Sequence, residues 1–192
     1  MRLKGGDVSI FSNILDELQA LVTNKIPYEI IPGVTAALGA AAYAGMPLTA
    51  RGYATSVRFL TYYKSDIVTN EHWQELAKTN DTLVFYMSSS TLPNVVAKLI
   101  EFGVDKEVRI AVAEQATTCY QHIYECNIYE YDSKLAGKSF ASPSLVIIGK
   151  VVALHQQFKW LQNSDHNQQY FASVEEGIQN INETIKPIKH VI

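Results

Sequence analysis

Two adjacent glycines and an acid lie near the start of the chain, at Gly5, Gly6 and Asp7. Glycine lets a backbone come close to a polar small molecule because it has no side chain, and a carboxylate accepts hydrogen bonds from hydroxyl or ammonium groups. An isolated Gly-Gly-Asp tripeptide is more often an ordinary turn. The stretch therefore predicts either a ligand-cradling turn or a structural one, and other parts of the chain must decide.

Three later segments place small polar residues where a strand ends or a helix begins. The turn at 32–35 feeds a helix whose first N–H groups and Thr35 hydroxyl can bind a polar ligand. Met87 directly follows an apolar strand, and Glu-Gln-Ala-Thr-Thr at 114–118 follows another. Ligands of open α/β sheets bind beyond the carboxyl ends of the strands. Each segment alone also fits a capped helix, a core methionine or a polar turn, but together they favour one shared pocket.

The elements that would position these segments alternate along the chain. Helical spacing of apolar residues covers 13–22, and an alanine-rich helix is predicted at 36–44, with Thr35 as its N-cap and Gly45 after its end. Further helices are predicted at 72–78 and 92–102, and strands at 28–31, 56–62, 82–86, 108–113 and 144–148, with one or two more between 121 and 131. The succession of strands and helices predicts the α/β fold class.

Two changes in pattern divide the chain. Residues 46–55 show little periodicity, and they are predicted to link a first α/β part, 1–54, to a second β/α series, 55–155. From Gln156 onward, Gln, Asn, His and Lys accumulate, and only 174–185 shows helical spacing. Residues 156–192 are therefore interpreted as a peripheral tail without chemistry.

Composition argues against several function classes. The net charge of −3, with no block of five like charges, argues against nucleic-acid binding, and no apolar run approaches the roughly 18 residues of a membrane helix. The N-terminus has no apolar signal core, so the expected location is the cytoplasm. Cys119 and Cys126 are interpreted as reduced, half-buried thiols, and no metal site is expected although His122 lies between them. No catalytic triad, paired-carboxylate, Walker or dinucleotide-binding pattern is found.

Several collinear blocks resemble the tetrapyrrole methylases, and most narrowly the uroporphyrinogen-III C-methyltransferases within that family. They cover about residues 2–155 and read KGGD at 4–7, IIPGVTAALGAAAYAGMPLT at 30–49, SVRF at 56–59, TLVFYM at 82–87, EQATT at 114–118 and GKVVAL at 149–154. The resemblance implies two α/β domains with S-adenosyl-L-methionine in the cleft between them. It also implies C-methylation of uroporphyrinogen III at C2 and C7, which yields precorrin-2 for sirohaem or cobalamin, with S-adenosyl-L-homocysteine as the other product. A homodimer is implied as well.

By the same likeness, single positions acquire expected roles. The implied cofactor contacts are Gly5, Gly6, Asp7, Ile10, Thr35, Ala36, Met87 and Ala116, the last at a position where the family commonly has glycine. Residues 143–145 are expected to border the adenine. Arg51 and Arg58 are candidates for binding the carboxylates of the tetrapyrrole substrate, because a guanidinium binds a carboxylate through two hydrogen bonds. Ordinary surface arginines are the alternative.

The chain also departs from the family pattern. Val8, Ser9 and residues 11–14 replace a stretch that usually carries an arginine and flexible glycines. Roughly a third of the family's length, with a Gly-Pro-Gly-Asp-Pro loop, is expected before Arg2, so residues 1–54 are interpreted as an incomplete first domain. No catalytic residue is assigned. Three alternatives stay open: another precorrin methyltransferase, a non-catalytic remnant that acts as a dimerisation module, and an unrelated small-molecule-binding α/β domain.

Overall fold

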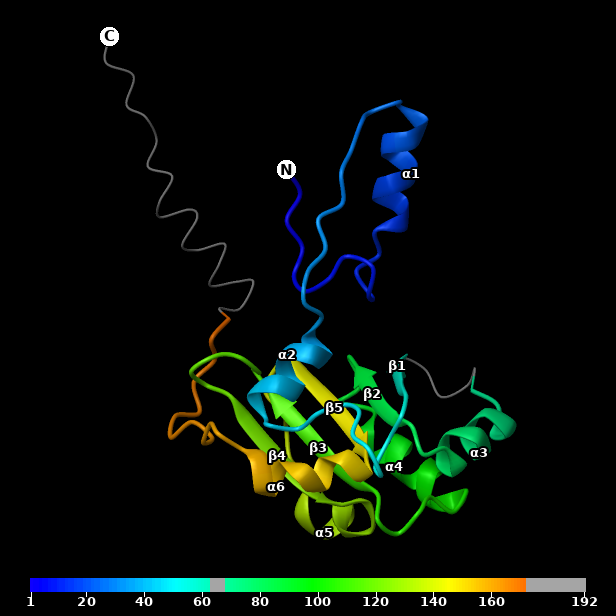
Figure 1. Cartoon of the computed structure of the whole chain (residues 1–192), viewed down its shortest axis with the longest axis vertical. Helices are drawn as coiled ribbons and strands as arrows, with labels where there is room; N and C mark the ends of the chain where they lie inside the picture. Colours follow the sequence, from blue (N-terminus) through cyan, green and yellow to red (C-terminus); the bar gives the residue numbers. More distant parts are fainter. Residues whose placement is uncertain (63–67, 172–192) are drawn as a thin grey trace.

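The computed structural model describes residues 1–62 and 68–171. In this part of the chain, five strands form one mixed sheet in the order β1-β2-β5-β3-β4 (Figure 1). The strands are β1 (Val57–Thr61), β2 (Thr82–Tyr86), β3 (Arg109–Glu114), β4 (His122–Asn127) and β5 (Ser144–Gly149). β1 and β2 are parallel, and the other neighbours pair antiparallel. The carboxyl ends of β1, β2 and β3 therefore share one edge with the amino ends of β4 and β5.

Alternation along the central strands sends side chains to two separate cores. One core receives Leu83, Phe85, Ile110, Val112, Val146 and Ile148, and the other receives Val84, Tyr86, Ala111, Ala113, Leu145 and Ile147. Both faces of these strands are covered, which explains why their sequences are near-continuous apolar runs rather than alternating ones.

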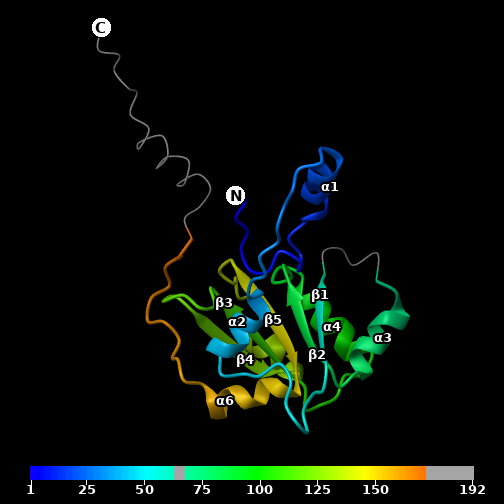
Figure 2. The same ribbon diagram turned by 45° about the horizontal axis from the view of Figure 1, so that its top comes forward.

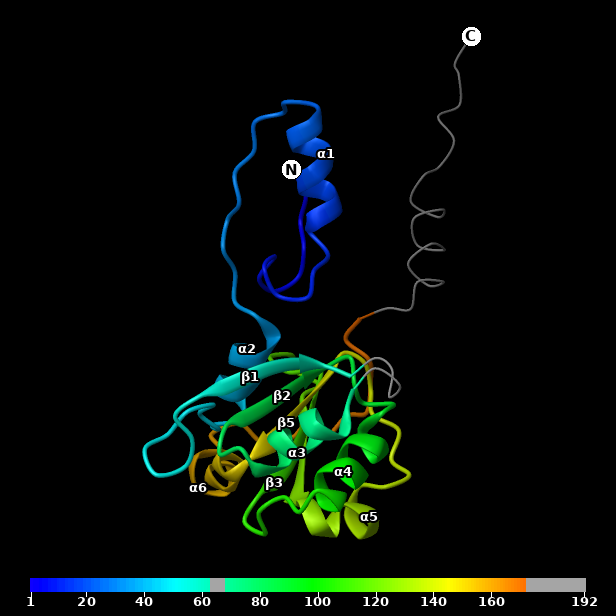
Figure 3. The ribbon, with the colours of Figure 1, turned by 90° about the vertical axis from the view of Figure 1, so that its right-hand side faces the viewer.

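Helices α3 (Asn70–Lys78) and α4 (Leu92–Glu101) cover the first face, together with the short helices η2 (Ile128–Glu130) and α5 (Tyr131–Lys134). Figure 3 shows α3, α4 and α5 on one side of the sheet and α2 and α6 on the other. The hydroxyl of Thr69 caps α3 by accepting the His72 N–H, and Trp73 of this helix is buried in the core.

Helix α2 (Ala36–Tyr43) covers the opposite face with small side chains. Ala37, Ala40 and Ala41 are buried in one cluster with Ala111 and Ala113 of β3. Methyl groups on both sides let the helix backbone approach the sheet closely, as the alanine-rich sequence predicts.

The end of α2 is held by residues beyond the last strand, where η3 (Lys150–Leu154) leads into α6 (His155–Phe158). His155 Nδ1 lies 2.6 Å from the Ala44 carbonyl oxygen, and Trp160 Nε1 donates to the Ala42 carbonyl at 2.9 Å. These bonds satisfy carbonyl groups that a helix end leaves without intrahelical partners. Residues 155–160 therefore form a clamp on α2, and the interpretation of residues 156–192 as a peripheral tail stays a prediction.

Residues 1–35 form an arm that projects from the sheet, with α1 (Leu15–Thr23) at its far end (Figure 1). No residue of α1 is buried. The strand predicted at 28–31 is absent: the segment is extended, but no strand in the described part of the chain pairs with it. Ile31 is 67% exposed, so the apolar run at 28–31 does not belong to the sheet.

The other predicted elements within the described residues are confirmed to within a few positions, and the α/β class is confirmed. The segment between 121 and 131 contains one strand, followed by η2 and α5. The periodic stretch at 174–185 lies outside the described residues. Within those residues, no helix is long and apolar enough to cross a bilayer.

Candidate ligand-binding site

A cavity of about 710 Å³ lies at the sheet edge where β2 and β3 end and β5 begins. Its lining comes from six separate parts of the chain: Gly6; Val34, Thr35, Ala36, Gly39 and Ala40; Tyr86, Met87 and Ser89; Ala113, Ala116 and Thr117; Ser142, Pro143, Ser144 and Leu145; and Phe171. These segments are far apart in the sequence, and the strand order brings them to one edge. Ligands of α/β folds bind at such edges, so this cavity is the leading candidate site.

The turns around Gly6 and Gly33 lie against each other where the arm meets the sheet, and the carboxylate of Asp7 joins them. Asp7 accepts a hydrogen bond from the Gly33 N–H at 2.8 Å, and it also accepts from the backbone and the hydroxyl of Ser9. The Ser9 hydroxyl, followed by the Gly33 and Ser9 N–H groups, lowers the pKa of the Asp7 carboxyl. This carboxylate is thus ionised at neutral pH, and it holds Gly6 beside residues 34–36.

Gly33 is the residue that makes this crossing sterically feasible. A Cβ at position 33 would overlap the Gly6 carbonyl oxygen and lie 3.4 Å from the Asp7 Cα. Gly6 has a φ of +70°, a conformation that favours glycine, whereas a Cβ at Gly5 would meet nothing within 4 Å. Gly6 and Gly33, rather than Gly5 and Gly6, therefore form the close backbone contact.

Tyr86 joins the end of β2 to the start of α2. Its hydroxyl accepts the Ala37 N–H at 3.1 Å and shares a hydrogen bond with the Thr35 hydroxyl at 2.7 Å. Thr35 occupies the N-cap position as predicted, but its side chain makes no cap bond, and the Tyr86 hydroxyl satisfies a helix N–H instead. The ring of Phe11 packs on Tyr86 with centroids 5.0 Å apart, which attaches the arm to the sheet.

Three residues with side chains adopt left-handed backbone conformations around the cavity: Met87 (φ 53°), Gln115 (φ 45°) and Thr117 (φ 71°). Non-glycine residues enter this region at an energetic cost, and they gather where ligand contacts constrain the backbone. Met87 is 65% exposed although it directly follows the buried β2. It lines the cavity instead of entering the core.

The structure brings five of the eight predicted cofactor residues into the lining: Gly6, Thr35, Ala36, Met87 and Ala116. The remaining three are Gly5, Asp7 and Ile10. Asp7 acts on the cavity through Gly33, as described above, and Ile10 packs against the core under α2. Residues 143–145 also line the cavity.

The two predicted carboxylate-binding arginines lie toward the other end of the sheet. Arg58 pairs in register with Leu83 near the start of β2, and its guanidinium bonds Asp81 at 2.5 Å and Glu75 at 2.6 Å. Hydrogen bonds to Glu75 and then Asp81 raise the Arg58 pKa. Arg51 lies in the exposed turn between Ala50 and Ala54. A substrate-binding role for either arginine stays a prediction.

The sequence does not predict a site role for Tyr86 or Phe171, which line the cavity, or for Gly33, which packs against the lining residue Gly6. A hydroxyl-bearing residue directly before Met87, at the carboxyl end of a predicted strand, was the available signal for Tyr86. Phe171 lies in the segment interpreted as free of chemistry, and nothing local in the sequence indicates that it reaches the cavity.

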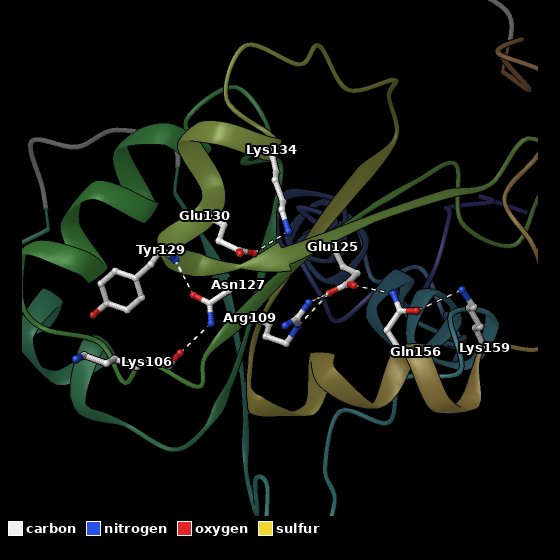
Figure 4. Close-up of polar contacts among 9 residues, drawn as sticks. All are labelled: Lys106, Arg109, Glu125, Asn127, Tyr129, Glu130, Lys134, Gln156 and Lys159. Carbon is white, nitrogen blue, oxygen red and sulfur yellow. Dashed lines mark hydrogen bonds and ion pairs between the residues drawn. The ribbon is translucent and has the colours of Figure 1, made fainter.

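A second, smaller hollow of about 370 Å³ lies along the outer edge of β4, between α5 and α6. Figure 4 shows the polar contacts beside it. Glu125 accepts two hydrogen bonds from Arg109, at 3.0 and 2.5 Å, and one from Gln156 Nε2 at 2.7 Å. The cluster links β3, β4 and α6. Its charged groups are engaged with one another, which indicates a structural role.

Comparison with known proteins identifies the family. The family model of the tetrapyrrole (corrin/porphyrin) methylases matches residues 1–132. The chain belongs to the tetrapyrrole methylases. A siroheme synthase of Pseudomonas putida (strain W619) is 39% identical to it over 168 residues, which cover 88% of this chain and 36% of that protein. This chain thus spans about a third of the length of the curated relatives that it matches.

Solved structures agree with this assignment. A uroporphyrin-III C-methyltransferase of Thermus thermophilus is 31% identical, with a TM-score of 0.66, and the match covers 82% of this chain and 66% of that chain. A second structure of the Thermus enzyme is a complex with S-adenosyl homocysteine; it is 26% identical, with a TM-score of 0.64, over 80% of this chain and 66% of that one. The tetrapyrrole-methylase-like α/β fold is therefore established.

Proposed function

We propose that this chain carries the methyl-donor pocket of an S-adenosyl-L-methionine-dependent methyltransferase that converts uroporphyrinogen III to precorrin-2 by C-methylation at C2 and C7. Membership of the tetrapyrrole methylases supports the reaction class. The observation that carries the proposal is the meeting of Gly6, Thr35–Ala36, Met87 and Ala116 in one cavity, because the family resemblance assigns these positions to the cofactor.

The cavity fits this cofactor in size and chemistry. Its volume of about 710 Å³ lies within the range of roughly 300–1,000 Å³ found for small-molecule sites. Met87, Pro143 and Leu145 offer apolar surface for a purine, and the lining residues Ser89 and Ser144 carry hydroxyls suited to a ribose. The amino end of α2 favours the negative charge of a carboxylate through its N–H groups.

The roles of the protein in this reaction are positioning and exclusion of water. When bound, S-adenosyl-L-methionine supplies an electrophilic methyl group on its sulfonium, and an electron-rich pyrrole carbon needs no nucleophile from the protein. Gly33 lets the backbone of Gly6 lie close beside residues 34–36, which places Gly6 in the cavity lining, while Tyr86 fixes the start of α2 relative to Met87. Holding the two reactants in the right orientation lowers the activation barrier, because their translational and rotational entropy is lost on binding and not in the reaction step.

Isothermal titration of S-adenosyl-L-homocysteine into the purified chain tests the cofactor assignment. We expect a dissociation constant in the range of about 1–100 μM, and a loss of at least about tenfold for Gly33→Ala, because the added methyl group would force Gly6 away from residues 34–36. The control is Gly137→Ala, which lies outside the cavity lining and whose Cβ meets nothing within 4 Å. Its φ of +79° makes an alanine there costly for stability, so this variant should be less stable and still bind S-adenosyl-L-homocysteine as the wild type does. A wild-type chain that takes up no S-adenosyl-L-homocysteine would end the proposal.

Transfer of a labelled methyl group to a panel of tetrapyrroles tests the substrate. Incorporation into uroporphyrinogen III supports the reaction proposed here. Incorporation only into a later precorrin would replace that substrate while keeping the methylase assignment. Tight S-adenosyl-L-homocysteine binding without transfer to any tetrapyrrole would favour the non-catalytic module.

A further inference from the structure

Residues 163–171, which we call the strap, run from α6 along the outer edge of β4 toward the cavity (Figure 2). Asn163 binds the backbone of Ile123 in the manner of a neighbouring strand: Oδ1 accepts the Ile123 N–H at 2.8 Å, and Nδ2 donates to its carbonyl at 3.1 Å. The Ser164 N–H donates to the Gln121 carbonyl at 3.0 Å. The strap is thus attached to an edge strand whose polar groups would otherwise face solvent.

The far end of the strap is held by the side chain of Gln115. Its Nε2 donates to the Gln168 carbonyl at 3.0 Å, and its Oε1 accepts the Tyr170 N–H at 2.7 Å. Gln115 is 2% exposed, so both ends of a buried amide are satisfied by strap backbone. Tyr120 adds a third bond, from its hydroxyl to Gln168 Oε1 at 2.8 Å, and its ring lies 6.4 Å from that of Tyr170.

Gln115 connects this attachment to the cavity. Its neighbours Ala116 and Thr117 line the cavity, and its own φ of 45° is a strained conformation for a residue with a side chain. The strap continues from Tyr170 to Phe171, whose ring lies 5.1 Å from that of Tyr170 and which also lines the cavity. Phe171 of the strap thereby adds an aromatic side chain to the cavity lining, and it lies outside residues 1–132, which the family model matches.

We infer that the strap completes the methyl-donor pocket: Phe171 contacts the bound cofactor, and Gln115 is the positioning residue that holds Phe171 in place. The inference rests on the proposed function, because it takes S-adenosyl-L-methionine as the ligand. Coupling between two binding events is reciprocal. Cofactor binding must therefore stabilise the docked strap to the same extent that the docked strap stabilises cofactor binding.

The first experiment compares two phenylalanines of equal exposure in the full chain. Phe171 and Phe158 are each 52% exposed, but only Phe171 lines the cavity. Removal of the Phe171 ring leaves the buried cores untouched, and Phe171→Ala should weaken S-adenosyl-L-homocysteine binding about three- to tenfold in isothermal titration, as expected for one lost aromatic contact. Phe158→Ala should bind as the wild type does.

The second experiment tests how Gln115 acts. Gln115→Leu removes both amide bonds at similar volume, and we expect S-adenosyl-L-homocysteine affinity to fall as far as in Phe171→Ala. The double variant should lose no more than either single variant, because both changes remove the same contact. If the two side chains contributed independently, the fold-losses in affinity of the single variants would multiply in the double variant. That result would contradict the positioning role of Gln115.

Hydrogen exchange measures the docking directly. The Tyr170 amide, which donates to Gln115, should exchange at least about threefold more slowly when S-adenosyl-L-homocysteine is bound, whereas the Val112 amide in the central β3 should not change. In Gln115→Leu this protection should disappear while the Val112 amide stays protected, which also reports that the variant is folded.

The outcomes separate the two proposals. If the wild-type chain binds S-adenosyl-L-homocysteine and Phe171→Ala binds it equally well, the strap inference is overturned and the proposed function stands. If binding leaves the Tyr170 amide unchanged, the coupling is overturned in the same way. If the wild-type chain binds no S-adenosyl-L-homocysteine, the proposed function fails and the inference fails with it.

Discussion

At the residue scale, the structure distinguishes positions that the sequence presents as equivalent. The two cysteines illustrate this: Cys119 is exposed, whereas Cys126 of β4 is fully buried in the core under α3 and α4. Burial, reinforced by Glu125 and Glu130, raises the pKa of the Cys126 thiol to about 11. A buried thiol disfavours the charged thiolate, so Cys126 is a structural apolar residue. The interpretation of both thiols as half-buried is wrong.

This difference predicts the pH dependence of thiol labelling. In the native chain a disulfide reagent should label one thiol at pH 8, the exposed Cys119. Cys126 has a pKa of about 11, so only about a tenth of its thiol is ionised even at pH 10. Labelling of Cys126 should require denaturant at either pH. The control is Cys119→Ser, which should show no rapid labelling. Two rapidly labelled thiols in the native wild type would contradict the burial of Cys126.

At the element scale, α2 depends on contacts from both ends of the sequence. Its first turn is held by Tyr86, and its carbonyl end by His155 and Trp160. Gly45 follows the helix with a φ of +60°, and a Cβ there would overlap the Phe158 carbonyl oxygen. The short helix of alanines has little side-chain area to bury, so we expect these contacts at its two ends to contribute to its stability.

The clamp can be measured with a pair of glycine substitutions. Gly45→Ala and Gly52→Ala both place an alanine at positive φ, at a cost of about 1–2 kcal/mol each, but a Cβ at position 52 meets nothing within 4 Å. Gly45→Ala also forces α2 and α6 apart, so its total cost should reach about 3 kcal/mol or more in urea unfolding. Equal losses for the two variants would show that the close contact contributes nothing.

At the scale of the whole molecule, burial is divided unevenly. The sheet and its helices form two continuous cores, whereas α1 has no buried residue and the arm exposes apolar side chains along much of its length. An exposed apolar surface of this kind is typical of an interface. Homodimer formation and a cytoplasmic location stay predictions, as does the division of the chain at residues 54 and 155.

Valine truncations at two sites test this division of stability. Val95 of α4 is fully buried, and Val95→Ala should cost roughly 2–3 kcal/mol in the free energy of unfolding. Val22 of α1 is 57% exposed, and Val22→Ala should cost less than about 0.5 kcal/mol in the monomer. A large, concentration-dependent cost for Val22→Ala would contradict an exposed α1 and would indicate that a second copy covers it.

The sequence by itself determined the local elements and the family. Periodicity predicted α2, α4 and the strands β2, β3 and β5, because these runs are apolar enough to be buried whatever their neighbours are. Alternation rather than a continuous apolar run predicted β1, none of whose residues is buried. The motif blocks predicted segments that meet at the cavity. Met87 and the stretch around Ala116 directly follow predicted strands, and residues in that position lie at the edge of the sheet.

Tertiary structure decided which residues meet. The strand order β1-β2-β5-β3-β4 cannot be derived from local pattern, yet it pairs Ala113 with Leu145 at the cavity and Arg58 with Leu83 near the start of β2. The segment 28–31 failed as a strand because a strand needs a partner, and local composition does not supply one. Phe171 lines the cavity at the end of a segment that Gln115, Tyr120 and Asn163 bind through long-range hydrogen bonds. Local sequence therefore determines which secondary structure a segment can form, and long-range tertiary contacts determine which other residues it meets.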